Sequence, residues 1–268
     1  MPALQIGATG ADVKRVQMAL DRAGCNVGQP DGVFGPDTLA AVKAFQAAKH
    51  LGVDGVAGVM TKAALGIIAG PGPDITGSVT VDKVMQMLPD TSRANVIRHL
   101  PDVLAALKAC ALGDRWMILM VLGTIYVETG QFAPIPEGIS RYNTSPGGEP
   151  FDLYDDRTDL GNEGPPDGAT YKGRGFVQVT GRANYAKYSV PGEDLVADPD
   201  LALNSVVASR ILATYMKDRE LAIRVASAEG NLADLRRLVN GGTNGLDTFS
   251  EAYCRGRADL PGPSAGLD

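Results

Sequence analysis

A twelve-residue pattern occurs twice near the N-terminus, and this repeat constrains the fold of that region more than any other feature of the sequence. The first copy, DGVFGPDTLAAV, begins at Asp31, and the second, DGVAGVMTKAAL, begins at Asp54, 23 residues later. Each copy opens with Asp-Gly, and glycine adopts the positive φ of a tight turn at no steric cost. Because the remainder of each copy suits a helix, the repeat predicts two successive turn-and-helix units.

The helices around these turns carry apolar residues at helical spacing. Pro36 suits the first turn of a helix, where its missing N–H is harmless. Leu39, Val42 and Phe45 then recur on one helical face. An earlier helix over 12–23 offers a second apolar face, made by Val13, Val16 and Leu20. We therefore predict a three-helix unit of about 65 residues, near the lower size limit for folding alone.

A segment rich in glycine and proline separates this unit from the rest of the chain. Residues 67–78 read IIAGPGPDITGS, and their Gly-Pro-Gly-Pro core can neither continue a helix nor donate to a sheet. We place a linker there, between a first domain at 1–66 and a second at 79–268. The longest apolar stretch, residues 116–127, is shorter than the ~20 residues that span a bilayer, so it predicts a buried helix and no membrane insertion.

Composition argues against several classes of function. The net charge is −6 and no basic stripe is present, which argues against nucleic-acid binding. Three scattered cysteines are too few for a disulfide framework, and two histidines without a Cys-x-x-Cys pair argue against a zinc site. We expect a monomer without metal or organic cofactor. Because the N-terminus lacks a basic region followed by an apolar core, we also expect no secretory signal peptide.

A buried helix that ends in a carboxylate is predicted in the second domain. Asp114 can cap a helix over 115–129, apolar residues surround this helix, and Gly130 is suited to end it. Glu128 then lies in the last turn, where the helix dipole disfavours negative charge and partial burial favours the protonated form. A protonated carboxyl group is what general-acid catalysis requires. From position alone, a Glu exposed at a frayed helix end is equally compatible.

A second carboxylate, Glu137, follows nine residues later within APIPEGISRYN. Two prolines and a glycine place it in a loop. Hydrolysis of a glycosidic bond usually needs two carboxyl groups, one that protonates the leaving oxygen and one that activates water or attacks the sugar. A helix-end acid facing a loop carboxylate supplies such a pair, although many exposed Glu pairs share this spacing.

The segment YKGRGFVQVTGRANY combines glycines that allow close backbone approach with a short run of alternating residues. We predict a strand over 176–180 with Phe176, Gln178 and Thr180 on one face and two valines on the other. Amide, hydroxyl and aromatic groups on one face suit a sugar site, with Asn184 on the next turn. An edge strand whose polar face meets solvent is the alternative.

The first domain resembles the peptidoglycan-binding domain of bacterial and phage cell-wall hydrolases. The matching residues are LQIGATGADVKRVQMAL followed by DGVFGPDTLAAVKAFQ, and the resemblance covers nearly all of 1–66. It implies a three-helix fold that binds bacterial cell wall through a groove near the Asp-Gly turns. Candidate wall-binding residues are Asp31, Phe34 and Asp54.

The second domain resembles glycoside hydrolase family 19, which holds chitinases and many phage endolysins. The motifs follow the family's order: ETGQF, the Glu137 loop ending in RYN, LGNEGPPDG, YKGRGFVQVTGRANY and VNGGTNG. The short gap between the two Glu residues is similar to the endolysin branch. The resemblance implies a mainly α-helical, lysozyme-like fold with two lobes around a cleft and a small β element, and an inverting mechanism.

The resemblance also implies roles for individual residues. Glu128 matches the general acid and Glu137 the second carboxylate. Two departures are the neutral Asn244, where plant members of the family carry an acidic residue, and the absence of the plant disulfides. Candidates for positioning substrate or water are Gln178, Thr180, Asn184, Asn240, Tyr142 and Tyr171.

Tyrosines and acidic residues in the same region allow further readings. Tyr142, Tyr154 and Tyr171 can each stack on a sugar or pack in the core. Residues 149–167 hold seven acidic residues against one arginine, but the ligand spacing of an EF-hand is absent, so we expect a solvated loop at the rim of the cleft rather than a calcium site. His99 we expect to be structural.

These features together predict a modular, phage-type endolysin that hydrolyses β-1,4 bonds of peptidoglycan while its first domain tethers it to the wall. We expect it in the host cytoplasm until a separate membrane-permeabilising protein releases it to the cell wall. The alternatives are a chitinase, a lytic transglycosylase and a non-enzymatic binding protein. Glu137 distinguishes the transglycosylase, because that reaction uses one Glu and no water.

Overall fold

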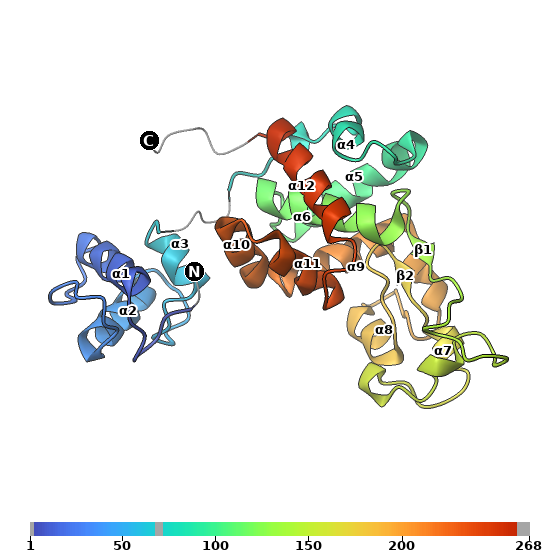
Figure 1. Ribbon diagram of the computed structural model, residues 1–268, viewed down its shortest axis with the longest axis horizontal. Helices are drawn as coiled ribbons and strands as arrows, with labels where there is room; N and C mark the ends of the chain where they lie inside the picture. Colours follow the sequence, from blue (N-terminus) through green and yellow to red (C-terminus); the bar gives the residue numbers. More distant parts are fainter. Residues whose placement is uncertain (1–2, 68–71, 262–268) are drawn as a thin grey trace. The chain divides into compact units, whose positions relative to one another are not determined.

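The computed structural model describes residues 3–67 and 72–261, which form two compact, mainly helical units (Figure 1). One unit comprises Met1–Gly72 and Glu220–Leu235, and the other comprises Pro73–Arg219 and Arg236–Asp268. The unit boundary falls inside the segment that we predicted as a linker, of which 68–71 lie outside the described residues. The grouping of 220–235, which holds helix α10 (Glu220–Glu229), with the first unit is not what a continuous domain at 79–268 leads one to expect.

Three helices build the N-terminal part of the first unit: α1 (Ala11–Arg22), α2 (Pro36–Ala48) and α3 (Val59–Ala64). Pro36 is the first residue of α2, as its fixed φ predicts. The two predicted apolar faces meet in one core. Its buried members are Leu4, Val13, Val16, Leu20, Val27, Phe34, Ala41, Val42, Phe45 and Ala57.

The sequence repeat is also a repeat of hydrogen bonds. In the first copy, Gln17 Nε2 donates to Asp31 Oδ1 at 2.9 Å and to the Val33 carbonyl at 3.0 Å. Thr38 Oγ1 lies 3.0 Å from the same nitrogen, and Gln17 Oε1 accepts from the N–H of Gly32 at 2.8 Å. The Asp-Gly turn is therefore fastened to α1 by one buried amide.

The second copy reproduces this arrangement with Gln46. Its Nε2 donates to Asp54 Oδ1 at 2.7 Å and to the Val56 carbonyl at 3.0 Å, with Thr61 Oγ1 also at 3.0 Å. Its Oε1 accepts from the N–H of Gly55 at 2.9 Å. Both glutamines are buried, so each turn is held from inside by a fully used side chain.

The second unit is built from α-helices and short 3-10 turns, with one two-stranded antiparallel pair. In the pair, β1 (Ile135–Pro136) meets β2 (Arg174–Gly175) with Ile135 opposite Gly175. The 3-10 turns are η1 (Thr76–Ser78), η2 (Asp152–Tyr154), η3 (Thr158–Leu160) and η4 (Pro199–Leu203). The α-helices of this part of the chain are α4 (Val81–Met87), α5 (Arg93–Ala109), α6 (Arg115–Thr129), α7 (Asp167–Thr170), α8 (Arg182–Tyr188), α9 (Ser205–Lys217), α11 (Leu232–Asn240), which begins before the unit boundary, and α12 (Leu246–Asp259).

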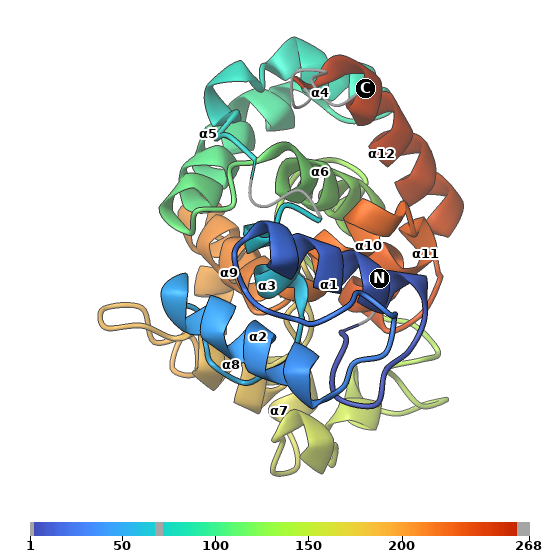
Figure 2. The ribbon, with the colours of Figure 1, turned by 90° about the vertical axis from the view of Figure 1, so that its left-hand side faces the viewer.

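Helix α6 is the central helix of this unit, as its all-round apolar sequence predicts. Every residue from Met117 to Ile125 is buried. Asp114 caps the helix by accepting from the N–H of Trp116 at 3.1 Å, and Gly130 ends it with a φ of 64°. Helix α12 packs on α6, and α9 packs on α5 (Figures 1 and 2). Among the described residues, no helix has the length and apolar character needed to cross a membrane.

The predicted strand over 176–180 is wrong, and the segment forms a turn instead. The strand residues are Arg174 and Gly175, after which the chain turns back so that Val179 and Arg174 exchange backbone hydrogen bonds. Gln178 takes a φ of 52°, which an extended strand does not allow. Phe176 consequently points into the core, at 0% exposure, instead of sharing a face with Gln178.

Candidate active site

Glu128 lies at the C-terminal end of α6, where the sequence predicts it, and it is paired with an arginine. Arg236 Nη1 donates to Glu128 Oε1 at 2.6 Å, and Arg236 Nε donates to the carbonyl of Asn244 at 2.7 Å. The Arg236 side chain is 3% exposed and that of Glu128 is 19% exposed. Glu128 is thus neither frayed into solvent nor left without a compensating charge.

The ion pair corrects the electrostatic part of the sequence argument. The helix dipole and burial both disfavour a carboxylate at this helix end. Arg236 comes from α11, 108 positions away in sequence, and places a guanidinium against Glu128 Oε1. The sequence contains one indication of this pair: Arg236 follows Leu235 on a strongly amphipathic helix. An arginine that becomes buried there needs a carboxylate partner.

Glu137 follows directly after β1 and is held by three hydrogen bonds to its carboxylate. Tyr154 Oη donates to Oε1 at 2.9 Å, and Asn143 Nδ2 donates to the same oxygen at 2.9 Å. The N–H of Gly173 donates to Oε2 at 3.0 Å. The Glu137 N–H itself donates to the Gly173 carbonyl at 2.7 Å. The loop carboxylate is therefore fixed by the backbone of Gly173, which precedes β2, and by the side chains of Tyr154 and Asn143.

Tyr154 and Asn143 both contact the Glu137 carboxylate, and neither is predicted from the sequence to do so. Asn143 is completely buried, and its Nδ2 also donates to the carbonyl of Gly138 at 2.9 Å. Burial, followed by the hydrogen bond to the Glu137 carboxylate, raises the pKa of Tyr154 to about 12. The sequence predicts only that Tyr154 stacks on a sugar or packs in the core, because no local pattern connects it with a carboxylate 17 positions earlier.

Gly173 is the point at which the loop of Glu137 meets the turn of Gln178. A Cβ at this glycine would lie 2.9 Å from Gln178 Oε1 and 3.0 Å from Glu137 Oε2. Gln178 Nε2 donates to the carbonyls of Ile135 and Gly175, at 3.0 Å each. The structure thus brings Gln178 and Glu137 to the same glycine, with the Gln178 side-chain oxygen and the carboxylate both facing it.

Thr180 and Asn184 extend this cluster. Thr180 Oγ1 donates to the carbonyl of Gln178 at 3.0 Å, and Asn184 Nδ2 donates to the carbonyl of Thr180 at 2.8 Å. Both side chains are half-buried. Their amide and hydroxyl groups stabilise the turn that carries Gln178, and their assignment as substrate- or water-positioning residues stays a prediction.

Asn240 is the last residue of α11, the helix that also carries Arg236. Its Nδ2 lies 3.2 Å from the Asn244 carbonyl, and its Oδ1 accepts from the N–H of Gly242 at 2.9 Å. Arg236 donates to the same Asn244 carbonyl. Asn244 therefore contributes its backbone to this cluster, at the position where the plant members of the resembled family carry an acidic side chain.

Tyr142 and Tyr171, the two tyrosines among the candidate positioning residues, lie in different environments. Tyr142 is 74% exposed, with Arg141 Nη2 donating to its hydroxyl at 2.7 Å, so its ring is available to a ligand. Tyr171 is 4% exposed and packs against Tyr185, with ring centroids 5.4 Å apart. Its hydroxyl donates to the carbonyl of Val196 at 3.3 Å. Tyr171 is a packing residue, because its ring is covered on the inside of the unit.

The candidate wall-binding residues also differ in exposure, one being buried and two lying on the surface. Phe34 is 1% exposed and belongs to the core, so it is a packing residue and not a ligand contact. Asp31 and Asp54 lie on the surface, but each carboxylate accepts from its turn and from a glutamine. The amide of Gln17 and the N–H of Val33 hold the pKa of Asp31 below its ordinary value. Both aspartates therefore have a structural role in the turns.

The acidic segment 149–167 is organised by internal bonds, and the described residues contain no cluster of His, Cys, Asp and Glu suited to a metal ion. Asp167 accepts a bidentate pair from Arg182, at 2.8 and 2.6 Å. Asp155 accepts from the N–H of Gly168 at 2.8 Å, and Asp152 accepts from the N–H of Ser145 at 2.7 Å. The hydrogen bonds of these carboxylates stabilise the conformation of the loop.

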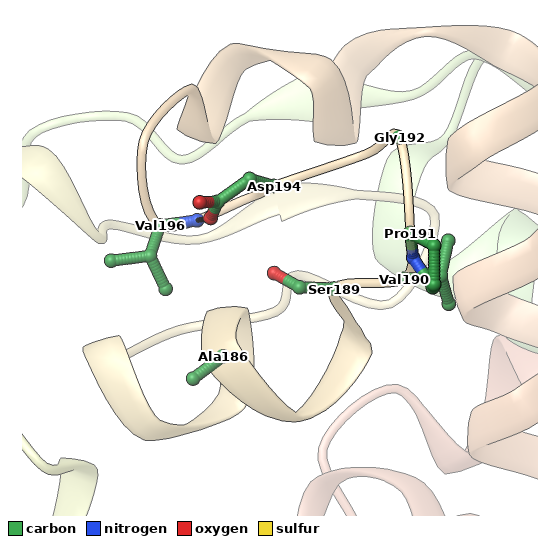
Figure 3. Close-up of a pocket in the computed structure, with 7 residues that line it drawn as sticks. All are labelled: Ala186, Ser189, Val190, Pro191, Gly192, Asp194 and Val196. Atoms are coloured by element: carbon green, nitrogen blue, oxygen red, sulfur yellow. Dashed lines mark hydrogen bonds between the residues drawn. The ribbon is translucent and has the colours of Figure 1, made fainter.

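A surface pocket of about 620 Å³ lies beside the C-terminal end of α8 (Figure 3). It is lined by Ala186, Ser189, Val190, Pro191, Gly192, Asp194 and Val196, none of which is a predicted site residue. The Ser189 hydroxyl donates to the Tyr185 carbonyl and accepts from the N–H of Leu195, while Asp194 accepts from backbone N–H groups of its own loop. The polar side chains that line the pocket, Ser189 and Asp194, thus make hydrogen bonds that hold the loop in place.

Comparison with known proteins agrees with the two units. Residues 9–65 match the family described as "Putative peptidoglycan binding domain". A spore cortex-lytic enzyme of Bacillus cereus is 46% identical over 59 residues, which cover 22% of this chain and 23% of that protein. A glycosyl hydrolase family 19 domain-containing protein of Haemophilus influenzae is 31% identical over 129 residues, 46% of this chain and 59% of that protein.

A solved structure supports the fold of the larger unit. Chitinase C from Streptomyces griseus is 20% identical, aligns with 72% of this chain and 81% of its own, and gives a TM-score of 0.50. The chain therefore combines a peptidoglycan-binding-type N-terminal domain with a mainly α-helical, family 19-like domain. Since the chain spans about 59% of the Haemophilus protein and 23% of the Bacillus protein, these relatives share parts of their lengths with it.

Proposed function

We propose that this chain is a peptidoglycan hydrolase of the endolysin type, which cleaves β-1,4 glycosidic bonds of the glycan strands. The observation that carries this proposal is the combination, in one chain, of a match to a peptidoglycan-binding domain with a family 19-like unit that holds two fixed carboxylates. A wall-binding domain raises the local concentration of the enzyme on an insoluble polymer without adding a catalytic contact.

Glu128 acts as the general acid in this proposal. Arg236 binds Oε1, so the proton is carried on Oε2 and passes to the leaving glycosidic oxygen. As the proton leaves, negative charge develops on Glu128 next to a fixed guanidinium. Arg236 then stabilises the transition state more than the protonated ground state, which is the condition for an interaction to accelerate the reaction.

Glu137 acts as the general base in an inverting reaction. Its carboxylate accepts three hydrogen bonds and carries no cationic partner among the described residues, which suits a group that must accept a proton from water. In an inverting pair the carboxyl groups lie ~6.5–9.5 Å apart to admit that water. Gln178 and Thr180, on the adjoining turn, then help to hold water and substrate.

The biological setting belongs to the same proposal. We infer a phage lysis enzyme that acts as a monomer and reaches the wall after a separate protein permeabilises the membrane. The expected products are glycan fragments with ordinary reducing ends, since water is the nucleophile.

Mass spectrometry of digested peptidoglycan tests this function. Reducing-end N-acetylmuramic acid supports a muramidase, whereas 1,6-anhydro ends contradict the use of water and indicate a lytic transglycosylase. Cleavage of chitin oligomers without cleavage of peptidoglycan indicates a chitinase. NMR of the anomeric proton early in hydrolysis of a soluble β-linked oligosaccharide tests the stereochemistry: an initial α-anomer supports Glu137 as base, and an initial β-anomer excludes inversion.

A further inference from the structure

The two oxygens of the Glu137 carboxylate are in different environments. Within the described part of the chain, Oε1 accepts from two side chains, Tyr154 and Asn143, at 2.9 Å each. Oε2 accepts from the backbone N–H of Gly173 at 3.0 Å. A carboxylate oxygen offers about two lone-pair sites, so Oε1 is saturated and Oε2 retains one site. Gln178 Oε1 approaches the same glycine, since a Cβ there would lie 2.9 Å from Gln178 Oε1 and 3.0 Å from Glu137 Oε2.

Tyr154 connects this carboxylate to a rigid part of the unit. Its carbonyl accepts from Asn162 Nδ2 at 2.7 Å, and Asn162 Oδ1 accepts from the N–H of Arg182 at 2.9 Å. Arg182 begins α8 and forms the bidentate pair with the buried Asp167. The Tyr154 backbone is therefore anchored to the start of α8. Through the hydrogen bond from its hydroxyl, Tyr154 fixes the position of Glu137 relative to that helix.

The tyrosine hydroxyl is well suited to this task. Tyr154 is half-buried, and Phe151 lies beside its ring with centroids 6.5 Å apart. A phenol donates one hydrogen bond, and its pKa, raised to about 12, keeps it a donor at any pH at which an enzyme works. An aromatic side chain also has few rotatable bonds, so little conformational freedom remains at its end.

We propose that Tyr154 is a positioning residue for the reaction, which fixes Glu137 through Oε1 and so assigns Oε2 as the oxygen that takes the proton from water. This inference rests on the proposed function of Glu137 as general base. Tyr154 touches neither substrate nor water in this assignment. Its effect reaches the reaction through the orientation of the carboxylate, and misplacement of a reacting group by about 1 Å can lower a rate about 100-fold.

Kinetics of Tyr154→Phe test the inference, with Tyr126→Phe as the matched control. Tyr126 also donates to a carboxylate, Asp90 Oδ2 at 3.1 Å, but that pair is separate from Glu137. For Tyr154→Phe we expect kcat on soluble glycan fragments to fall by about 10- to 100-fold while KM stays within about twofold, the pattern of an interaction made in the transition state. Tyr126→Phe should match wild type. A Tyr154→Phe kcat within twofold of wild type, or a loss carried by KM, overturns the inference.

A second measurement does not depend on turnover. In the full chain labelled with ¹³C at tyrosine Cζ, NMR titration follows Tyr154, which the Tyr154→Phe spectrum identifies. Glu137→Gln should lower the pKa of Tyr154 from about 12, because the carboxylate contributes to the shift, while leaving it above 10 because burial remains. An unchanged titration overturns the contact whatever the kinetics of Tyr154→Phe.

The outcomes separate this inference from the proposed function. Wild-type protein that releases no glycan products contradicts the proposed function itself, and the positioning role falls with it. Loss of activity in Glu137→Gln combined with full activity in Tyr154→Phe leaves the function standing and overturns the positioning role alone.

Discussion

Arg236 donates to Glu128 across 2.6 Å, from a side chain 3% exposed to one 19% exposed. The pair joins α11 to the end of α6, so it contributes to the fold and, in the proposed mechanism, to the chemistry. These two contributions can be separated by substitution.

Arg236→Met should lower both stability and activity. Removal of the guanidinium leaves a partly buried carboxylate without its partner, which we expect to cost about 1–3 kcal/mol of unfolding free energy. Urea unfolding of Arg236→Met, Glu128→Gln and the double variant measures the coupling. We expect the double variant to be more stable than the sum of the single losses implies, and strict additivity would contradict a direct interaction.

Glu128→Gln should abolish hydrolysis in a protein that still folds and binds the wall, although its free energy of unfolding falls because Arg236 loses its charged partner. The amide retains the shape of the carboxyl group but has no proton to donate, and general-acid catalysis typically contributes ~10²–10⁴-fold. Release of soluble fragments from sacculi measures activity, and co-sedimentation with sacculi measures binding. More than a tenth of wild-type activity in this variant rules out the assignment.

Gly173→Ala should impair activity more than stability. The new methyl group meets Gln178 Oε1 at 2.9 Å, Glu137 Oε2 at 3.0 Å and Glu137 Cβ at 3.1 Å, so both side chains must shift by a few tenths of an ångström. The same shift displaces the proposed base, so we expect kcat to fall at least about 10-fold. Gly138→Ala is the matched control, because nothing lies within 4 Å of a Cβ at that position. Equal activities of the two variants would falsify the importance of this contact.

Gln46→Ala should destabilise the first unit. It leaves the buried N–H of Gly55 without its acceptor and the Asp54 turn without its donor, a loss of about 2–4 kcal/mol. Differential scanning calorimetry of the full chain should show a transition shifted to lower temperature. Gln5→Ala, at an exposed position, serves as control and should change stability by no more than about 0.5 kcal/mol. Similar shifts in both variants would contradict the role of the buried amide.

His99 should make the stability of the larger unit depend on pH. Its ring packs edge-on against Phe176 at 6.1 Å, and Nδ1 donates to Ser205 Oγ at 2.9 Å, because that hydroxyl uses its own proton on Asp102. Burial, aided by the positive charge of Arg98 and opposed by Asp102, lowers the pKa of His99 below 6.5.

The sign of this dependence follows from proton binding. Below about pH 6.5 the unfolded chain takes up a proton that folded His99 resists, so stability falls as pH decreases from there to the folded-state pKa. His99→Asn should flatten this fall in urea unfolding between pH 8 and pH 5.5. His50→Asn, an exposed position with a φ of 53° that Asn tolerates, should keep the wild-type slope. A wild-type slope in His99→Asn would exclude His99 as its source.

Local sequence patterns predicted the parts of this molecule that depend on neighbours in the chain. The helix that carries Glu128, its Asp114 cap and its Gly130 end follow from residues within one segment. The core of the first unit follows from spacing alone, through Val13, Val16 and their partners on α2.

The wrong predictions and the missed contacts depend on backbone angles and tertiary contacts, which local sequence patterns do not record. Alternation around Gln178 suggested a strand, but the backbone turns at positive φ there, and side-chain patterns carry no record of that angle. Arg236 and Tyr154 reach the two carboxylates through tertiary contacts that no spacing encodes. Phe34 is a predicted wall contact, and Tyr171 a candidate for sugar stacking or for packing; both lie in the core, because an aromatic residue near a turn suits either role.

The paired glutamines of the first unit have a consequence for its evolution. Gln17 and Gln46 fasten both turns from the interior, so the conformation of each turn depends little on the neighbouring surface residues. Val33 and Val53, both about half-exposed, can then vary without loss of the scaffold. A duplicated frame of this kind lets the surface around each turn change independently while the fold of the unit stays the same.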